Sequence, residues 1–167
     1  MCNINIDLLI QNKSWKKQKD INLNLMEDTF KAVYNHLKVP ICKRNIEVSI
    51  TLSDDKNIRV LNKEYRHKDK STNVLTFSLY NSKKDIFRDM ETLPVMCLGD
   101  MVFSYETIEK EAEEQNKTFK NHFIHMLIHS YLHLFAYDHI KAKERKEMES
   151  IEIEILKKFG IDNPYLI

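Results

Sequence analysis

The 167-residue chain has few of the residues that mark several common functional classes. Its only glycines are Gly99 and Gly160, and neither a P-loop nor a dinucleotide-binding fingerprint can be formed with so few. Its three cysteines include no CxxC pair, and an odd number favours a reducing compartment over a disulfide framework. The first residues also lack the basic stretch and long apolar segment of a secretory signal, so we expect a cytoplasmic protein.

Neither the net charge nor the hydropathy of the chain predicts binding to a polyanion or to a membrane. Lys and Arg number 26 against 25 Asp and Glu, a net charge of +1, so any nucleic-acid site must be a local patch. The apolar runs are only a few residues long, too short to span a bilayer, although 43% of the residues are hydrophobic. Without repeats or linkers, the sequence predicts a single domain over residues 1–167 that has no membrane partner.

Hydrophobic periodicity predicts an α+β fold, in which a mixed sheet of about four strands packs against helices, one of them buried and histidine-bearing. Strands are predicted at residues 4–10, 46–52, 74–79 and 95–103. Helices are predicted at residues 26–37, 105–117, 119–135 and 148–159. A further short helix is predicted to carry Ile58 and Leu61. Residues 80–94 have no sustained period and are expected to form a loop.

Several helix ends carry residues with known terminal preferences. Either Ser53 or Asp54 is expected to cap the short helix, and Ser104 to cap the helix that begins at residue 105. Pro40 is expected to prevent the helix of residues 26–37 from continuing. Gly160 stands where a glycine is favoured after the last helix.

The predicted helix at 119–135 is apolar nearly all round, which is typical of a helix at the centre of a domain. It also carries four histidines that lie within about 80° of arc at 100° per residue. They are His122, His125, His129 and His133. An unpaired imidazole in apolar surroundings costs about 1–3 kcal/mol, so a polar partner is expected to meet this face.

His129 and His133 are one helical turn apart, the spacing that directs two ring nitrogens to a single ion. His139 follows six residues later, and a continuing helix would place it about 240° away. If the helix ends near Phe135 or Ala136, the chain can turn back and add a third nitrogen ligand. The sequence therefore predicts a catalytic metal centre of His129, His133 and His139 with a fourth position open.

Three neighbouring residues are not predicted to be ligands. His122 is interpreted as an ordinary histidine, partly exposed near the helix start. His125 either donates to a backbone carbonyl or orients a ligand. Asp138 either caps the last helix or supports a metal-bound imidazole.

Zinc peptidases of the HExxHxxGxxH type have the same histidine spacing, so a metallopeptidase-like hydrolase is an alternative. Those enzymes need a glutamate after the first histidine as the general base. Here that position is Ser130, which cannot take a proton from water at neutral pH. Peptide hydrolysis is therefore poorly supported.

Three sequence blocks resemble the signatures of one family. Residues 129–139, HSYLHLFAYDH, resemble the HGxLHLxGYDH signature of the YbeY family of bacterial rRNA maturation factors. Residues 61–77, LNKEYRHKDKSTNVLTF, are similar to its LNxxYRxKDxPTDVLSF block, and residues 98–104, LGDMVFS, to its LGDIVIS block. Family glycines are replaced by His67, Ser130 and Ala136, and a proline by Ser71. If the turn at Ala136 is left-handed, alanine there costs about 1 kcal/mol more than glycine.

The resemblance implies a zinc-dependent, single-strand-specific endoribonuclease acting in 16S rRNA 3′-end maturation and ribosome quality control. It implies one zinc ion per chain on His129, His133 and His139, and Arg66 as the functional arginine. The implied partners are precursor ribosomal RNA and the small subunit or its associated proteins. The attacking group is left open between water and the ribose 2′-hydroxyl. A non-catalytic ribosome assembly factor with a structural metal is the second alternative. Three neutral nitrogens suit zinc, although nickel and copper bind the same ligands.

Two local basic segments are candidates for contact with RNA. Around Arg66, the first comprises Lys63, His67, Lys68 and Lys70, which can hold an RNA backbone. The second comprises Lys13, Lys16, Lys17 and Lys19 beside Trp15. That tryptophan is interpreted either as a ring that stacks on a base or as part of a solvated loop.

Overall fold

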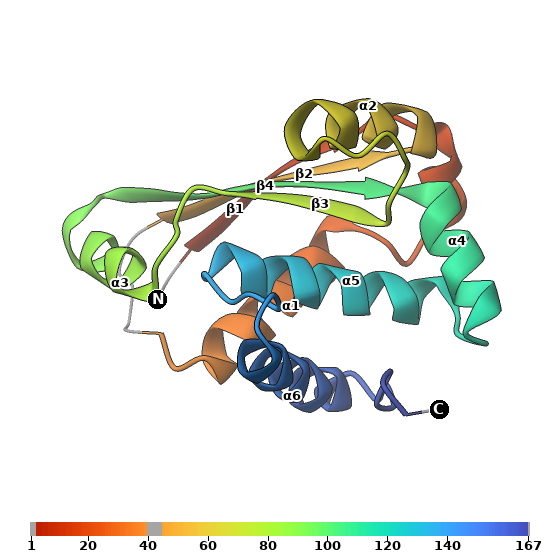
Figure 1. Cartoon of the computed structure of the whole chain (residues 1–167). Coiled ribbons are helices and arrows are strands. Elements are labelled where there is room, and N and C mark those ends of the chain that lie inside the picture. The colour runs from red at the N-terminus through yellow and green to blue at the C-terminus, as the bar shows by residue number, and fades with distance from the viewer. Residues whose placement is uncertain (1–2, 40–44, 167) are drawn as a thin grey trace.

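The computed structural model describes residues 3–39 and 45–166, in which four strands form one sheet (Figure 1). The strands are β1 (Asn3–Ile10), β2 (Asn45–Ser53), β3 (Val74–Ser78) and β4 (Val95–Ser104). The order across the sheet is β1-β2-β4-β3; β2 is parallel to both neighbours, whereas β3 is antiparallel to β4. The predicted mixed sheet is confirmed, and each predicted strand agrees with the structure to within one residue at each end.

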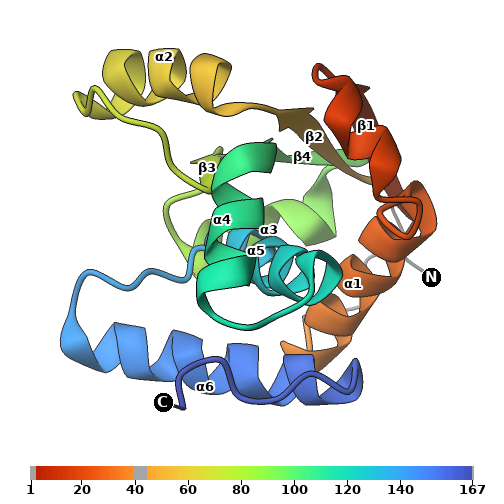
Figure 2. The same cartoon turned by 90° about the vertical axis from the view of Figure 1, so that its right-hand side faces the viewer.

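Helices cover both faces of the sheet. They are a 3-10 helix, η1 (Lys13–Lys17), and the α-helices α1 (Leu23–His36), α2 (Asp55–Arg66), α3 (Lys83–Thr92), α4 (Tyr105–Glu114), α5 (Phe119–Leu134) and α6 (Ala142–Lys158). α2 lies over one face, α1 and α5 lie against the other, and α6 packs on the far side of α5 (Figures 1 and 2). In the described ranges, no helix has both the length and the hydropathy needed to cross a membrane.

α5 is the central helix, and this position explains its composition. The face of β2 toward α5 consists of buried aliphatic residues, Ile46, Val48, Ile50 and Leu52. The helix has buried side chains around its whole circumference because the sheet, α1, α4 and α6 all contact it. The α+β fold with a buried histidine-bearing helix is therefore confirmed. A buried polar side chain on α5 is costly unless it is hydrogen-bonded, so the buried histidines of this helix need hydrogen-bond partners.

The loop predicted at 80–94 is wrong, because α3 forms within it. Ser82 caps this helix by accepting a hydrogen bond from the amide of Asp85 at 3.2 Å. Ile86 and Met90, one turn apart, are the residues that α3 buries. Ile86, Phe87, Met90 and Leu93 follow helical spacing over only two turns among charged residues, a helical pattern that the loop prediction missed.

The residues expected at helix ends are confirmed in part. Asp54, not Ser53, caps α2, and its side chain accepts from the amide of Asn57 at 2.9 Å. Ser104 precedes α4 but makes no side-chain cap, because its hydroxyl donates to the carboxylate of Asp55. Gly160 follows α6 with φ +70°, as expected. Pro40, expected to stop the first helix, lies outside the described residues.

Both interpretations of Trp15, a ring that stacks on a base and part of a solvated loop, are wrong. Trp15 is only 2% exposed, and its indole Nε1 donates to the carbonyl of Ser53 at 2.8 Å. Its ring makes edge contacts with Tyr105, Phe119 and Phe123. The lysines of the segment are exposed while the tryptophan belongs to the core, so the ring is not available to a base.

A β-bulge in β4 depends on Gly99. Glu47 of β2 is opposite Cys97 and the next residue, Val48, is opposite Gly99, so Leu98 is the extra residue. Gly99 has φ +142°, and a Cβ built on it would lie 2.2 Å from the carbonyl oxygen of Phe77. A side chain at this position is therefore opposed by both backbone conformation and contact with β3.

We expect Gly99→Ala to lower the free energy of unfolding by about 2 kcal/mol or more, because strain and overlap add. Gly160→Ala is the matched control: its φ is also positive, but open space surrounds the built Cβ, so only about 1 kcal/mol is expected. Urea unfolding of both metal-free variants measures the difference. Equal losses would contradict the close approach of β3 and β4 at Gly99.

Candidate metal centre

The structure brings the three predicted ligands together. His129 and His133 lie on α5 and His139 lies in the turn after it, and one ligand atom from each falls within 4.8 Å of the others. The Nε2 atoms of His129 and His133 are 3.1 Å apart. The ring of His139 completes the group, with its centroid 5.3 Å from that of His129 and 5.0 Å from that of His133.

A left-handed turn places the third histidine. α5 ends at Leu134, and Ala136 has φ +66°, so alanine occupies a conformation that glycine favours. The amide of Tyr137 donates to the carbonyl of Leu132 and the amide of Ala136 to that of His133, the paired bonds of a Schellman motif. The chain therefore reverses immediately after the second ligand, where the sequence predicted the helix to end.

Asp138 supports this turn and does not cap α6. Its Oδ1 accepts from the amide of His139 at 2.7 Å, which fixes the backbone of the predicted third ligand. The N-cap position of α6 is occupied by Lys141. Of the two interpretations of Asp138, helix capping is therefore wrong.

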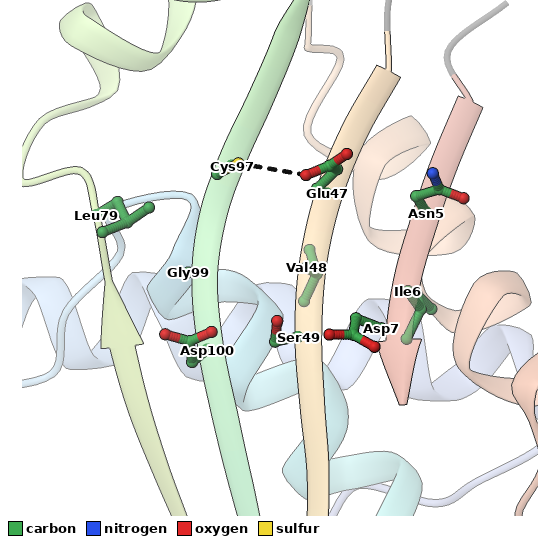
Figure 3. Close-up of a pocket in the computed structure, with 10 residues that line it drawn as sticks. All are labelled: Asn5, Ile6, Asp7, Glu47, Val48, Ser49, Leu79, Cys97, Gly99 and Asp100. Atoms are coloured by element: carbon green, nitrogen blue, oxygen red, sulfur yellow. Dashed lines mark hydrogen bonds between the residues drawn. The ribbon is translucent and has the colours of Figure 1, made fainter. Parts of the chain in front are cut away.

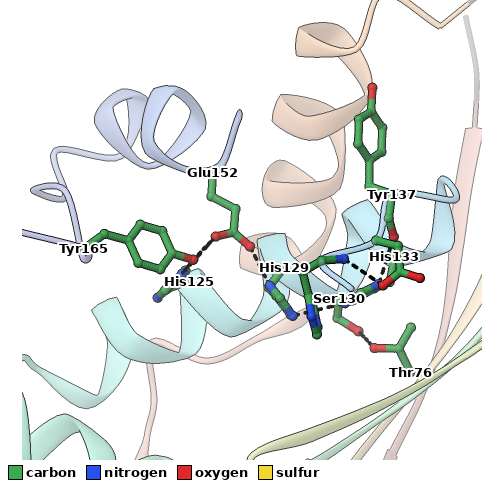
Figure 4. Close-up of polar contacts among 10 residues, drawn as sticks. Thr76, His125, His129, Ser130, His133, Tyr137, Glu152 and Tyr165 are labelled. Atoms are coloured by element: carbon green, nitrogen blue, oxygen red, sulfur yellow. Dashed lines mark hydrogen bonds and ion pairs between the residues drawn. The ribbon is translucent and has the colours of Figure 1, made fainter. Parts of the chain in front are cut away.

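Hydrogen bonds behind two of the rings decide which nitrogens can bind a metal. His133 Nδ1 lies 2.9 Å from the carbonyl oxygen of Tyr137, and His129 Nδ1 lies 2.5 Å from Oε1 of Glu152 on α6 (Figure 4). Because both partners accept, each Nδ1 carries a proton, and each Nε2 is the nitrogen turned toward the cluster. The two Nε2 atoms, 3.1 Å apart, are therefore placed to bind one cation together. The site thus fits a metal that prefers nitrogen ligands.

The charge states agree with this arrangement. Burial, together with the neighbouring His129 and His139, lowers the pKa of His133 to about 4, so the ring is neutral at pH 7. Burial alone would raise the pKa of Glu152, but hydrogen bonds with His125 and His129 lower this pKa to about 2. His133 is therefore a neutral imidazole, and Glu152, which lies behind His129, is an ionised carboxylate.

The histidine cluster opens into a cleft of about 980 Å³ that also contains Arg66. Arg66 is the last residue of α2, and its Nη2 donates to the carbonyl oxygen of Thr76 on β3 at 2.9 Å. Its guanidinium carbon lies 5.2 Å from the centre of the Phe77 ring, within the range of a cation–π contact. Arg66 is thus held across the cleft from α5 by the edge strand of the sheet.

The basic segment around Arg66 divides between the cleft and the outer surface. Lys68 lines the cleft with Arg66. Lys63, by contrast, lies 4.0 Å from the carboxylate of Asp69, which also accepts a hydrogen bond from Arg59. The cleft therefore receives only part of the positive charge that the sequence places in this segment.

The polar groups behind the cluster are the residues that sequence reasoning missed. Glu152 is fully buried, and Tyr165 donates a hydrogen bond to its Oε2 (Figure 4). Glu152 lies four residues after Met148 on the apolar stripe of α6, and a carboxylate within such a stripe is a signal that was available. The sequence around Tyr165 does not indicate its hydrogen bond with Glu152, because this contact depends on the tertiary fold.

The two remaining histidines of α5 are both buried. The predicted partial exposure of His122 is wrong: it is 1% exposed, and its Nε2 lies 2.7 Å from Oε2 of Glu111. His125 Nε2 contacts Oε2 of Glu152 at 3.4 Å and the hydroxyl of Tyr165 at 3.2 Å, not a backbone carbonyl. One of its interpretations, a role behind a ligand, therefore fits the geometry.

A second cavity, of about 440 Å³, lies on the sheet face turned away from α5 (Figure 3). Its charged lining residues are Asp7, Glu47 and Asp100. Cys97 donates from Sγ to Glu47 at 3.5 Å, and burial followed by this carboxylate raises the pKa of the thiol. Negative charge and a protonated thiol suit neither phosphate binding nor nucleophilic attack, so the histidine cleft is the candidate active site.

Comparison with known proteins identifies the family of the chain. The family model of endoribonuclease YbeY matches residues 9–160. The chain belongs to the YbeY family. Endoribonuclease YbeY of Agrobacterium fabrum (strain C58) is 36% identical over 171 residues, covering 99% of this chain and 96% of the relative. That of Sinorhizobium fredii (strain NGR234) is 33% identical over 168 residues, covering 99% and 94%.

A solved structure shares the fold. The solution structure of TM1509 from Thermotoga maritima has a TM-score of 0.55 and 24% sequence identity, and the match covers 93% of this chain and 92% of that chain. Membership of the YbeY family confirms the predicted nuclease activity and the resemblance drawn from the three sequence blocks.

We expect His133→Ala to abolish the stabilisation of the protein by zinc. At zinc concentrations of about 1,000 times Kd, wild-type protein should gain about 4 kcal/mol in unfolding free energy, and the variant less than about 1 kcal/mol. His36→Ala is the control, because His36 pairs with Glu154 outside the cluster. Thermal unfolding of chelator-treated protein with and without zinc measures the gain; a full response from His133→Ala would exclude it as a ligand.

Proposed function

We propose that this chain is a zinc-dependent, single-strand-specific endoribonuclease that acts in 16S rRNA 3′-end maturation and in ribosome quality control. It works as one cytoplasmic domain over residues 1–167, with ribosomal RNA precursor as substrate and the small subunit or its proteins as partners. One zinc ion is bound by His129, His133 and His139, and Arg66 is the catalytic residue. The observation that carries the proposal is the convergence of the Nε2 atoms of His129 and His133, 3.1 Å apart, in a cleft that also holds Arg66.

The chemistry divides between the metal and Arg66. Zinc supplies a Lewis acid that polarises a phosphoryl oxygen or a water molecule when it is bound. Cleavage of a phosphodiester increases negative charge on the non-bridging oxygens, and Arg66 offers a permanent charge and a fork of donors for them. In the described part of the chain, the Thr76 carbonyl is the one hydrogen-bond acceptor of this guanidinium, so several N–H donors remain for phosphate.

The cleft lining supports the preference for single strands. Phe77, Tyr80 and Tyr137 all contribute to it. Unpaired bases stack on aromatic rings, whereas the bases of a duplex are already stacked on one another. Lys68 adds positive charge beside the path of the RNA backbone.

The structure also weakens the peptidase alternative. The hydroxyl of Ser130, where those enzymes have their general base, is 2.6 Å from that of Thr76 and forms a hydrogen bond with it. A serine hydroxyl engaged in this way cannot replace the glutamate carboxylate that accepts a proton in those enzymes.

Metal-loaded protein incubated with unfolded casein should accordingly produce no fragments.

We expect Arg66→Ala to reduce cleavage of single-stranded ribosomal RNA precursor by about 100-fold to 1,000-fold, the usual loss when a charge-stabilising donor is removed. Zinc affinity and thermal stability should stay near wild type, because Arg66 is exposed and contacts no histidine of the cluster. Gel analysis of end-labelled RNA measures the rate, and the chemistry of the product ends identifies the attacking group.

Arg59→Ala is the matched control, since Arg59 lies on the same helix but pairs with Asp69. It should retain cleavage within about threefold, as expected for an exposed ion pair. Equal cleavage by wild type and Arg66→Ala would reject the catalytic role of Arg66 and favour a non-catalytic assembly factor. Equal cleavage of an annealed duplex would reject the preference for single strands.

A further inference from the structure

Glu152 is a buried carboxylate with an unusual set of partners. The residue is 0% exposed, and within the described ranges only histidines, His125 and His129, lie within ion-pair distance of it. An ionised carboxylate removed from water is costly unless charge and hydrogen bonds compensate it. No lysine or arginine of the described residues provides that charge.

The carboxylate is held from two sides. On one side, Oε1 accepts from His129 Nδ1 at 2.5 Å, and the opposite nitrogen of that ring faces the cluster. On the other side, Oε2 accepts from the hydroxyl of Tyr165 and lies 3.4 Å from His125 Nε2. Both oxygens are therefore engaged, and a single imidazole separates the negative charge from the position where the ligand nitrogens converge (Figure 4).

Tyr165 reaches Glu152 from the segment after α6. Asn163 Oδ1 accepts from the amide of Tyr165 at 2.8 Å, which forms a tight turn after the helix. The tyrosine ring meets the ring of His125 edge-on, with centroids 5.6 Å apart at 86°. The turn thus presents a neutral hydroxyl donor to the one carboxylate that contacts a ligand ring.

We propose that Glu152, held in place by Tyr165, is a positioning residue that sets the affinity of the histidine cluster for its metal. Glu152 fixes the proton of His129 on Nδ1 and places a negative charge behind the ring, so that Nε2 becomes a better ligand. The bound cation in turn compensates the buried carboxylate through the same ring. This inference rests on the proposed metal site, and it adds two residues that contact neither the ion nor the RNA.

The decisive variant is Glu152→Gln, which keeps the shape of the side chain and removes its charge. We expect zinc to bind about 10-fold to 100-fold more weakly, measured by competition with a chromophoric chelator. Metal-free Glu152→Gln should unfold at the wild-type temperature or above it, because replacing a buried charge by a neutral group is often neutral or stabilising. Glu154→Gln is the matched control: it makes the same change on the same helix, where the exposed carboxylate pairs with His36.

Tyr165→Phe gives a second, milder variant that removes one hydroxyl. Zinc affinity should fall roughly threefold to tenfold, as expected for the loss of one hydrogen bond to a charged group acting through an intervening ring. In the Glu152→Gln background the same change should have less than about a twofold effect, because Tyr165 acts through the carboxylate. An equal effect in both backgrounds would remove Tyr165 from the proposal.

Zinc affinities of Glu152→Gln and Tyr165→Phe within about twofold of wild type would overturn the inference, whatever happens to RNA cleavage. A lower unfolding temperature of metal-free Glu152→Gln with unchanged zinc affinity would assign Glu152 to the fold alone. If wild type binds zinc no better than His133→Ala, the proposed metal site fails and the inference fails with it. The first two results leave the proposed function intact, so the two failures are distinguishable.

Discussion

The metal centre depends on the convergence of two imidazole nitrogens. The Nε2 atoms of His129 and His133 lie 3.1 Å apart across one turn of α5. The carboxylate of Glu152 and the carbonyl of Tyr137 contact the Nδ1 atoms of these rings, so each ring is held with its Nε2 toward the cluster. A cation suits two ring nitrogens that are held so close together.

Those parts of the fold that local pattern controls could be predicted from the sequence. The strands follow from two-residue alternation and short apolar runs, and the central position of α5 follows from an apolar surface on all sides. The cluster was predictable because its first two members are one turn apart and the third follows the helix end. The sequence raised a left-handed turn at Ala136 as one possibility, because the family signature has glycine there, and the structure has that turn.

The remaining features depend on contacts between distant parts of the chain. Trp15 is surrounded by lysines in sequence but by aromatic rings of other elements in space, so its neighbours along the chain were a poor guide. In α3, Ile86 and Met90 pack against the core, and this tertiary contact cannot be read from the local sequence. Glu152 and Tyr165 acquire their roles only when α6 and the following turn pack beside α5.

The bulge at Leu98 makes the alignment of the sheet unique. Before the bulge, Met96 and Leu98 face the core; after it, Met101 and Phe103 do, so the inward residues change from even to odd numbers. In a regular strand the inward-facing residues all have even numbers or all have odd numbers, so a slip of two residues along its neighbour still turns apolar side chains inward. β4 has inward-facing residues of both kinds, so any slip buries the wrong side chains along part of the strand. The single extra residue in β4 therefore excludes the slipped strand pairings that a regular strand would allow.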